Sequence, residues 1–111
     1  MTDILWRLHT FDELKPAELY AILALRQRVF IVEQHCAYLD ADGLDADSLH
    51  LFGLDSEGVV CAYLRVVPPG RRFSGPSIGR VIPAPEVRRT GLGLLLTREG
   101  ISMTADRYPG S

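Results

Sequence analysis

The stretch Gly79-Arg-Val-Ile-Pro-Ala-Pro-Glu-Val-Arg-Arg-Thr-Gly-Leu-Gly93 carries the clearest structural signal in this chain. A short apolar run stops at Pro83, a basic turn with two glycines follows, and a helix-forming run begins after Gly93. This order predicts a strand, a loop and a helix. The first N–H groups of a helix have no partner within it, and the helix dipole adds partial positive charge there. The turn therefore has the parts of a phosphate-binding loop.

Two other kinds of phosphate loop do not fit this stretch. A Walker loop needs Gly-Lys-Ser/Thr, and the only lysine in the chain is Lys15. A dinucleotide-binding fingerprint needs a third small residue where this chain has Leu96. Gly91 and Gly93 let an anion approach the main chain, and Arg88 adds charge. The residues alone leave one alternative open, which is that the glycines merely join a strand to a helix.

Length and composition predict one domain over residues 1–111 of an ordinary soluble protein, with 47% apolar and 23% charged residues. No run of 18 apolar residues predicts a membrane span, and no signal peptide is apparent. Cys36 and Cys61 match no metal-site or disulfide spacing, so we expect reduced thiols in the cytoplasm. No metal site is predicted, because a calcium loop built on Gly43 would place Leu49 where a glutamate is needed.

The charges are divided unevenly along the chain. Residues 1–58 hold 4 Lys/Arg against 11 Asp/Glu, a net charge of −7, and residues 59–111 hold 8 against 3, a net charge of +5. The basic half suits a polyanionic cofactor, and the aspartates of the acidic half could attract a cationic amine. The alternative is that the two halves neutralise each other where they touch.

Hydrophobic periodicity predicts four strands, at residues 5–9, 50–55, 59–67 and 77–82. A capping box, Thr10-x-x-Glu13, precedes a helix that runs from about Pro16 to Phe30. The last helix starts near Leu92, and Gly100 weakens it by about 1 kcal/mol relative to alanine. Its predicted inner face consists of Leu92, Leu95, Leu96 and Met103.

Three arginines fall at positions that require an anionic partner. Arg26 lies in the apolar stripe of the first helix, and a buried guanidinium needs a carboxylate, for which Glu33 and Asp40 are the nearest candidates. A hairpin centred near Arg72 would place Arg65 opposite Arg80. Two like charges in that position need an anion between them, from the substrate or from the same acidic segment. The candidates in the chain are Glu33, Asp40 and Asp42.

Three stretches together resemble one known family. The order Arg88-x-x-Gly91-x-Gly93 directly after a strand is similar to the acetyl-CoA pyrophosphate loop of the GNAT N-acetyltransferases. Residues 25–38, followed by the aspartates of residues 40–45, resemble the N-terminal signature of the ElaA-type branch. Pro69-Gly70 with residues 76–81 resembles its middle strand. The resemblance runs in family order from about Trp6 to the last residue.

This resemblance implies an α/β (α+β) GNAT fold, with a mixed, mainly antiparallel sheet and flanking helices. It implies acetyl transfer from acetyl-CoA, without a metal, to a primary amine of a small molecule or peptide. Backbone groups of Val81 and Ile82 would hold the pantetheine, although Pro83 has no N–H to offer. The phosphates would meet the loop residues Arg88, Arg89, Thr90, Gly91, Leu92 and Gly93.

Catalytic and acceptor residues are assigned less directly. Glu33 is the first candidate for the general base and His50 the second, but His50 shares a strand face with Phe52 and Leu54, which favours a satisfied core histidine. His35, Cys36, Tyr38 and Arg80 would line the acceptor site.

The family continues after the last helix with a fifth strand, another helix and a final pair of strands, and its thiolate-protonating tyrosine lies in that later part. We therefore expect a chain that lacks these strands and whose fourth strand is an open edge, so that it forms a homodimer or strand-swapped oligomer. A non-enzymatic CoA-binding or dimerising remnant is the alternative function. Nucleic-acid binding through Arg71, Arg72, Arg88 and Arg89 is disfavoured, because the overall charge is acidic and no aromatics are interleaved. No membrane partner is predicted.

Overall fold

The computed structural model describes residues 4–35, 39–88 and 90–110 of the 111-residue chain. Four strands form one antiparallel sheet in the order β1-β2-β3-β4. The strands are β1 (Leu5–Thr10), β2 (Leu49–Leu54), β3 (Val60–Val67) and β4 (Ser77–Pro83). Each predicted strand is present, with its ends within one residue of the predicted ones. No helix in the described ranges is long and apolar enough to cross a membrane.

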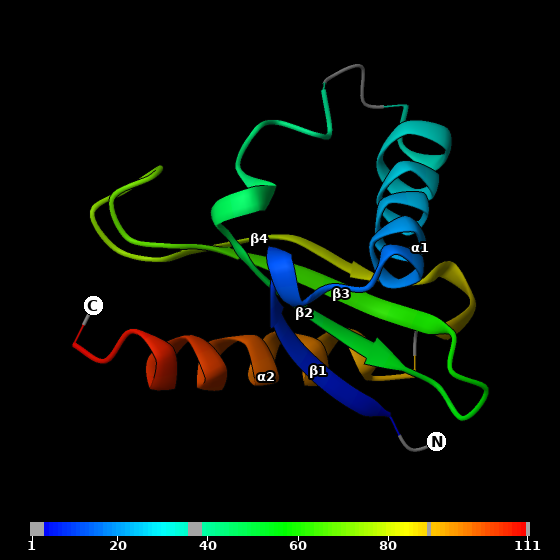
Figure 1. Ribbon diagram of the computed structural model, residues 1–111. Coiled ribbons are helices and arrows are strands. Elements are labelled where there is room, and N and C mark those ends of the chain that lie inside the picture. The colour runs from blue at the N-terminus through cyan, green and yellow to red at the C-terminus, as the bar shows by residue number, and fades with distance from the viewer. Residues whose placement is uncertain (1–3, 36–38, 89, 111) are drawn as a thin grey trace.

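The helix α1 (Pro16–Gln27) covers one face of the sheet (Figure 1). Residues 40–47, which we call the acidic loop, include the 3-10 turn η3 (Asp45–Asp47) and lie over the same face. A π-helical segment, η2 (Arg28–Glu33), continues α1 without a break. The apolar core on this face joins Ile22, Leu25 and Val29 to strand residues. The strand side of that core consists of Phe52, Tyr63, Ile82 and Ala84.

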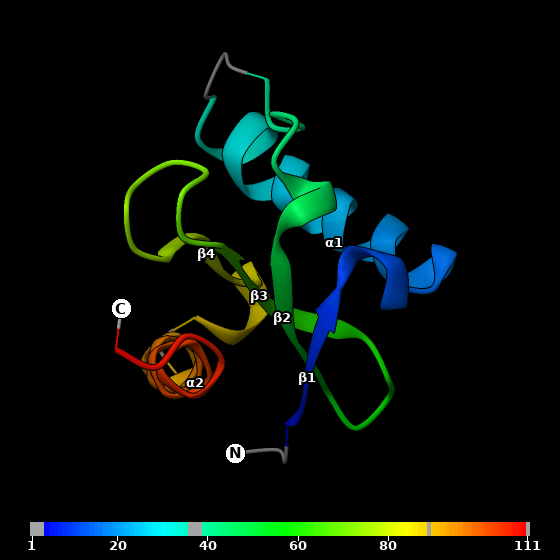
Figure 2. The same ribbon diagram turned by 60° about the vertical axis from the view of Figure 1, so that its left-hand side comes forward.

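The helix α2 (Leu92–Arg107) covers the opposite face, as the turned view also shows (Figures 1 and 2). Leu92 and Leu96 of this helix are buried against strand residues, but Leu95 is 37% exposed, so its predicted inward position is wrong. Gly100 takes an inward position instead. A Cβ at Gly100 would lie 2.5 Å from Cδ2 of Leu64, so this glycine lets the helix approach β3 closely.

The structure confirms one local prediction and corrects another. The Thr10-x-x-Glu13 capping box is formed, with the Thr10 N–H donating to Glu13 Oε1 at 2.8 Å, but it caps the short 3-10 turn η1 (Phe11–Glu13). The helix α1 starts separately at Pro16. In the β3–β4 pair, Arg65 lies opposite Gly79 and not opposite Arg80.

Candidate functional site

A β-bulge in β4 accounts for the shifted register. Arg65 pairs with Gly79 but Tyr63 pairs with Ile82, so Leu64 faces two residues of β4, Arg80 and Val81. Arg80 has a φ of 53°, in the left-handed region that residues with a Cβ rarely adopt. The sequence pattern did not reveal this bulge, because arginine is not the residue that normally marks a positive φ.

Beyond the bulge, main-chain groups of β4 alternate between β3 and the open edge of the sheet. The N–H of Ala84 donates to the carbonyl of Cys61 at 2.8 Å. Because antiparallel ladders alternate, Ile82 also directs its main-chain groups to β3, whereas Val81 and Pro83 direct theirs to the open edge. The predicted pantetheine contact thus fits Val81 better than Ile82. Pro83 offers only its carbonyl there.

After β4, a 3-10 turn, η4 (Pro85–Val87), leads into the start of α2. Gly91 precedes the helix with a φ of 85°, and no side chain caps the helix. The first intrahelical contact is from the N–H of Leu95 to the carbonyl of Gly91, at 3.2 Å. Among the described residues, no main-chain bond outside the helices and strands uses an N–H of residues 90–94 as donor. Amides at the start of a helix lack intrahelical acceptors, so this is the position at which we look for an anion-binding site.

The two glycines of the loop have different structural explanations. Gly91 is exposed and needs its glycine for the positive φ, while open space surrounds the position of a Cβ. Gly93 has no positive φ, and a Cβ there would lie 3.7 Å from Cγ of Pro83, an ordinary contact. The packing of the protein thus does not require glycine at position 93. A ligand approaching the main chain would require it.

Two ion pairs connect η2 to this loop. Arg88 Nη2 lies 2.6 Å from Glu33 Oε1, and both side chains are 38% exposed. Arg28 pairs with Glu86 in the same region. The predicted base Glu33 and the predicted phosphate ligand Arg88 are therefore direct partners. Of the two predicted partners of Arg26, Glu33 pairs with Arg88, and Asp40 is the one that binds Arg26.

The acidic loop forms a closed cycle of ion pairs with three arginines, which we call the Asp–Arg ring. It consists of Arg26, Asp40, Arg80, Asp42, Arg65 and Asp45, in which each neighbour contacts the next and the last contacts the first. Its contacts range from 2.8 to 3.3 Å. Arg26 and Arg65 are almost fully buried, with 0% and 1% exposure.

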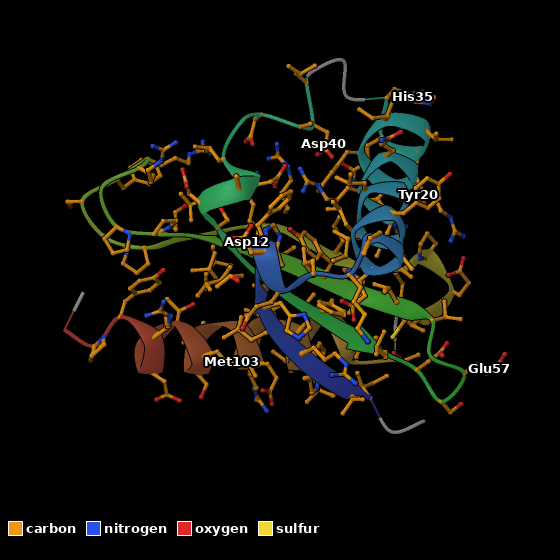
Figure 3. The ribbon with its side chains drawn as sticks, viewed as in Figure 1. Asp12, Tyr20, His35, Asp40, Glu57 and Met103 are labelled. Carbon is orange, nitrogen blue, oxygen red and sulfur yellow. The ribbon has the colours of Figure 1, made fainter. Side chains whose placement is uncertain are left out.

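Asp40 and Asp42 are the carboxylates that the ring supplies to Arg80 (Figure 3 labels Asp40, on the acidic loop). The predicted anion between Arg65 and Arg80 is Asp42, which binds Arg65 through both oxygens at 2.8 and 2.9 Å and Arg80 at 3.3 Å. Asp40 as partner of Arg26 is also confirmed, at 2.9 Å. Asp45 was not predicted as an arginine partner, and the only signal for it was its place in the same aspartate-rich segment as Asp40 and Asp42.

The ring shifts the pKa values of four of its members, Arg26, Asp42, Asp45 and Arg65, in the direction that favours their charged forms. Hydrogen bonds from Arg65 hold the pKa of Asp42 well below its usual range, against the effect of partial burial. Burial raises the pKa of Asp45, but bonds from Arg26 and Arg65 lower it more. Burial likewise works against the charge of Arg26, yet the bond to Asp45 leaves its pKa raised. Arg26, Asp42 and Asp45 are therefore charged at neutral pH.

His50 lies beside the ring with both ring nitrogens engaged. Its Nε2 is 2.9 Å from the carbonyl oxygen of Asp45, and its Nδ1 is 2.7 Å from the hydroxyl of Tyr63. A carbonyl only accepts, so Nε2 carries the proton and Nδ1 accepts from Tyr63. Burial lowers the pKa of His50 and raises that of Tyr63. This geometry is that of the satisfied core histidine.

The remaining predicted residues lie apart from this cluster. His35 is exposed beyond η2 with a φ of 56° and points away from the sheet (Figure 3). Cys36, Tyr38 and Arg89 lie outside the described residues. The described ranges contain no group of three or more His, Cys, Asp or Glu side chains able to hold a metal ion.

Comparison with known proteins gives relatives along nearly the whole chain. A UPF0039 protein of Synechocystis is 40% identical over 96% of this chain and 70% of its own length. The crystal structure of Escherichia coli ElaA matches with a TM-score of 0.91 and 32% identity, over 98% of this chain and 74% of that one. The crystal structure of an acyl-CoA N-acyltransferase from Pseudomonas aeruginosa matches with a TM-score of 0.86 and 38% identity, over 95% of this chain and 72% of that one. No protein-family model matches.

The chain belongs to the ElaA-like branch of the GNAT N-acyltransferase family. The predicted fold class is confirmed, since the antiparallel sheet with its two helices superimposes on GNAT structures. The ElaA-like chain spans about 70% of the length of two curated relatives, the Synechocystis protein and the ElaA protein of Escherichia coli.

Two more distant structures of the same fold were solved with ligands. A GNAT family N-acetyltransferase from Escherichia coli, in complex with CoA, is 22% identical with a TM-score of 0.66. A GNAT family acetyltransferase from Brucella melitensis, in complex with acetyl-CoA, is 20% identical with a TM-score of 0.65. At this level of identity they show a shared fold.

Proposed function

We propose that this ElaA-like chain binds acetyl-CoA with its diphosphate at the start of α2 and its pantetheine arm along the open edge of β4. The observation that carries the proposal is the glycine at position 93, which the packing of the protein does not require. It lies in the first turn of α2, where amides lack intrahelical acceptors, and Arg88 precedes that turn in the sequence. The CoA and acetyl-CoA complexes of structures with the same fold support this assignment.

The proposed reaction is transfer of the acetyl group to a primary amine. The amine nitrogen attacks the thioester carbonyl and loses a proton, the C–S bond breaks, and the departing thiolate takes up a proton. The main-chain N–H of Val81 at the bulge is the donor placed to polarise the carbonyl oxygen. Of the two candidate bases, Glu33 has a partly exposed carboxylate, whereas both nitrogens of His50 are engaged. We therefore assign the base to Glu33.

Titration calorimetry with acetyl-CoA on Gly93→Ala tests the binding site. Alanine at position 93 makes only an ordinary contact with Pro83, and it favours the helix by up to about 1 kcal/mol. We expect an unchanged or higher free energy of unfolding and a loss of acetyl-CoA affinity of about tenfold or more. An affinity equal to that of the unchanged protein would show that the phosphates do not bind here.

A thiol-release assay over a panel of primary amines tests the reaction. A general base contributes about 10²- to 10⁴-fold to the rate, so Glu33→Gln should lower kcat by at least about a hundredfold. An unchanged kcat would remove Glu33 from the mechanism. Acetyl-CoA binding without thiol release for any amine would identify the chain as a cofactor-binding remnant.

A further inference from the structure

The left-handed conformation of Arg80 needs an explanation in the surrounding structure. A φ of 53° is unfavourable for a residue with a Cβ, and such a conformation persists only where neighbouring contacts enforce it. In this sheet the conformation has a clear geometric result. It produces the bulge at which Leu64 faces both Arg80 and Val81, and it sets the direction of the Val81 main chain.

The Asp–Arg ring supplies those enforcing contacts. Arg80 Nε donates to Asp40 Oδ1 at 2.9 Å, and its Nη2 donates to the carbonyl of Asp40 at 3.1 Å. The same Nη2 reaches Asp42 Oδ2 at 3.3 Å. The guanidinium also lies 6.0 Å from the ring centre of Phe30. These contacts come from the acidic loop and from η2, so the bulge is fixed by segments 38 to 50 positions away in the sequence.

The carboxylates that grip Arg80 are themselves fixed. Asp40 binds Arg26 of α1, and Asp42 binds Arg65 of β3, with both guanidinium groups almost fully buried. Neither aspartate can follow a movement of β4 without breaking a second ion pair in a buried site. Asp45 completes the ring by binding Arg26 and Arg65. The ring thus has one corner on β4, held by two of its three aspartates.

We propose that Asp40 and Asp42 are positioning residues that act through Arg80 to keep the β4 bulge in the conformation that presents the main chain of Val81 to the acyl thioester. The identity of the ligand in this inference rests on the proposed function. The claim that the ring holds the bulge does not depend on that function. In this proposal Asp40 and Asp42 hold Arg80 in place in addition to stabilising the fold. Asp45 binds only Arg26 and Arg65 within the ring, so it does not have this role.

The first experiment compares three aspartates of the ring. Asp40→Asn and Asp42→Asn should change the amide chemical shifts of Arg80 and Val81, raise the hydrogen-exchange rate of the Val81 amide and weaken acetyl-CoA binding about tenfold. Asp45→Asn destabilises the same ring but leaves the contacts to Arg80, so it should change the affinity less than twofold. Asp47→Asn, in the same loop on an exposed ion pair with Arg71, is the control and should change nothing.

The second experiment separates the conformation of Arg80 from its charge. Arg80→Gly and Arg80→Ala both remove the guanidinium, but glycine adopts a φ of 53° freely and alanine does not. Arg80→Gly should therefore keep the bulge shifts of Val81 and bind acetyl-CoA about tenfold more tightly than Arg80→Ala. Equal losses in both variants would show that the guanidinium acts as a ligand, and the positioning role would be wrong.

The two claims fail in different ways. If the unchanged protein binds no acetyl-CoA, the proposed function is wrong, while the shifts and exchange rates at Arg80 and Val81 still decide whether the ring holds the bulge. If acetyl-CoA binds and Asp40→Asn, Asp42→Asn and Asp45→Asn weaken binding equally, the ring is a general stabilising device. Unchanged Val81 shifts in Asp40→Asn and Asp42→Asn would also overturn the inference.

Discussion

The two faces of the sheet are closed by different interactions. On the α1 face, an apolar cluster lies beside the Asp–Arg ring, and two guanidinium groups are almost fully buried there. On the α2 face, the buried cluster consists of apolar residues, and a helix glycine lets the main chain of α2 approach Leu64. One face therefore depends on charge and hydrogen bonding, and the other depends on shape.

This difference indicates which face of the sheet has a geometry that is fixed for function. Buried ion pairs add little net stability, because removing the charges from water costs about as much as their attraction returns. A ring of such pairs is therefore weak evidence for stability and better evidence for a fixed geometry. The ring lies on the face that carries the β4 bulge and η2. The apolar face holds α2, whose first turn is the proposed phosphate site.

The largest expected effect comes from breaking the ring while keeping the shape of the side chain. Arg26→Met removes the partner of Asp40 and Asp45 and leaves uncompensated buried charge, which costs about 3–5 kcal/mol of the free energy of unfolding. Arg28→Met, on a half-exposed pair in the next helical segment, is the control and should cost at most about 0.5 kcal/mol. Urea unfolding measures both. Similar small losses would show that the ring is not a stabilising unit.

The apolar face should respond to volume and not to charge. Gly100→Ala favours the helix, but its Cβ would lie 2.5 Å from Cδ2 of the fully buried Leu64, so we expect a net loss of about 1–3 kcal/mol. Helix propensity alone predicts the opposite sign. Adding Leu64→Val, which removes the clashing atom, should recover part of that loss in a double-mutant cycle. Additive losses in the cycle would contradict the close contact.

The apolar parts of the molecule were predictable from local patterns. Alternation along β1 assigns Trp6 and Leu8 to the more buried side, and the strand ends lie within one residue of their predicted positions. Periodicity also placed Leu92 and Leu96 correctly. It misplaced Leu95, which is 37% exposed, and it missed Gly100, whose lack of a side chain lets α2 approach Leu64.

For the charged residues, the sequence predicted that the arginines need carboxylate partners but not which carboxylate binds which arginine. The positions of Arg26, Arg65 and Arg80 showed that carboxylates were required, and Asp40 and Asp42 were among the candidates. The pairing depends on contacts 14 to 40 positions apart, which no local pattern records. The bulge was invisible for the same reason, since the φ of Arg80 is enforced by distant residues. The predicted attraction of a cationic amine is not supported, because all four loop aspartates are paired with arginines.

Acid should weaken the α1 face in two steps. The pKa of folded His50 is below its usual value of 6.5, so the unfolded chain binds a proton first and the free energy of unfolding falls as the pH drops below about 6.5. The pKa values of Asp42 and Asp45 are below 3.8, so their contribution is complete above that pH and is lost below it. Urea unfolding at stepped pH measures both. His50→Gln should remove the upper step alone, and an upper step that persists in this variant would contradict its assignment to His50.

The smallest expected effect concerns the exposed pair between Glu33 and Arg88, which links the π-helical segment to the phosphate loop. An exposed pair contributes about 0.2–1 kcal/mol, so Glu33→Gln should leave the free energy of unfolding nearly unchanged. It also releases Arg88 for the diphosphate, so the acetyl-CoA Kd measured by calorimetry should fall by up to about fivefold, with the gain shrinking as salt is added. Arg88→Ala should raise the Kd, and combining it with Glu33→Gln should abolish the gain. A gain that survives in the double variant would show that Glu33 repels the phosphates directly and does not compete for Arg88.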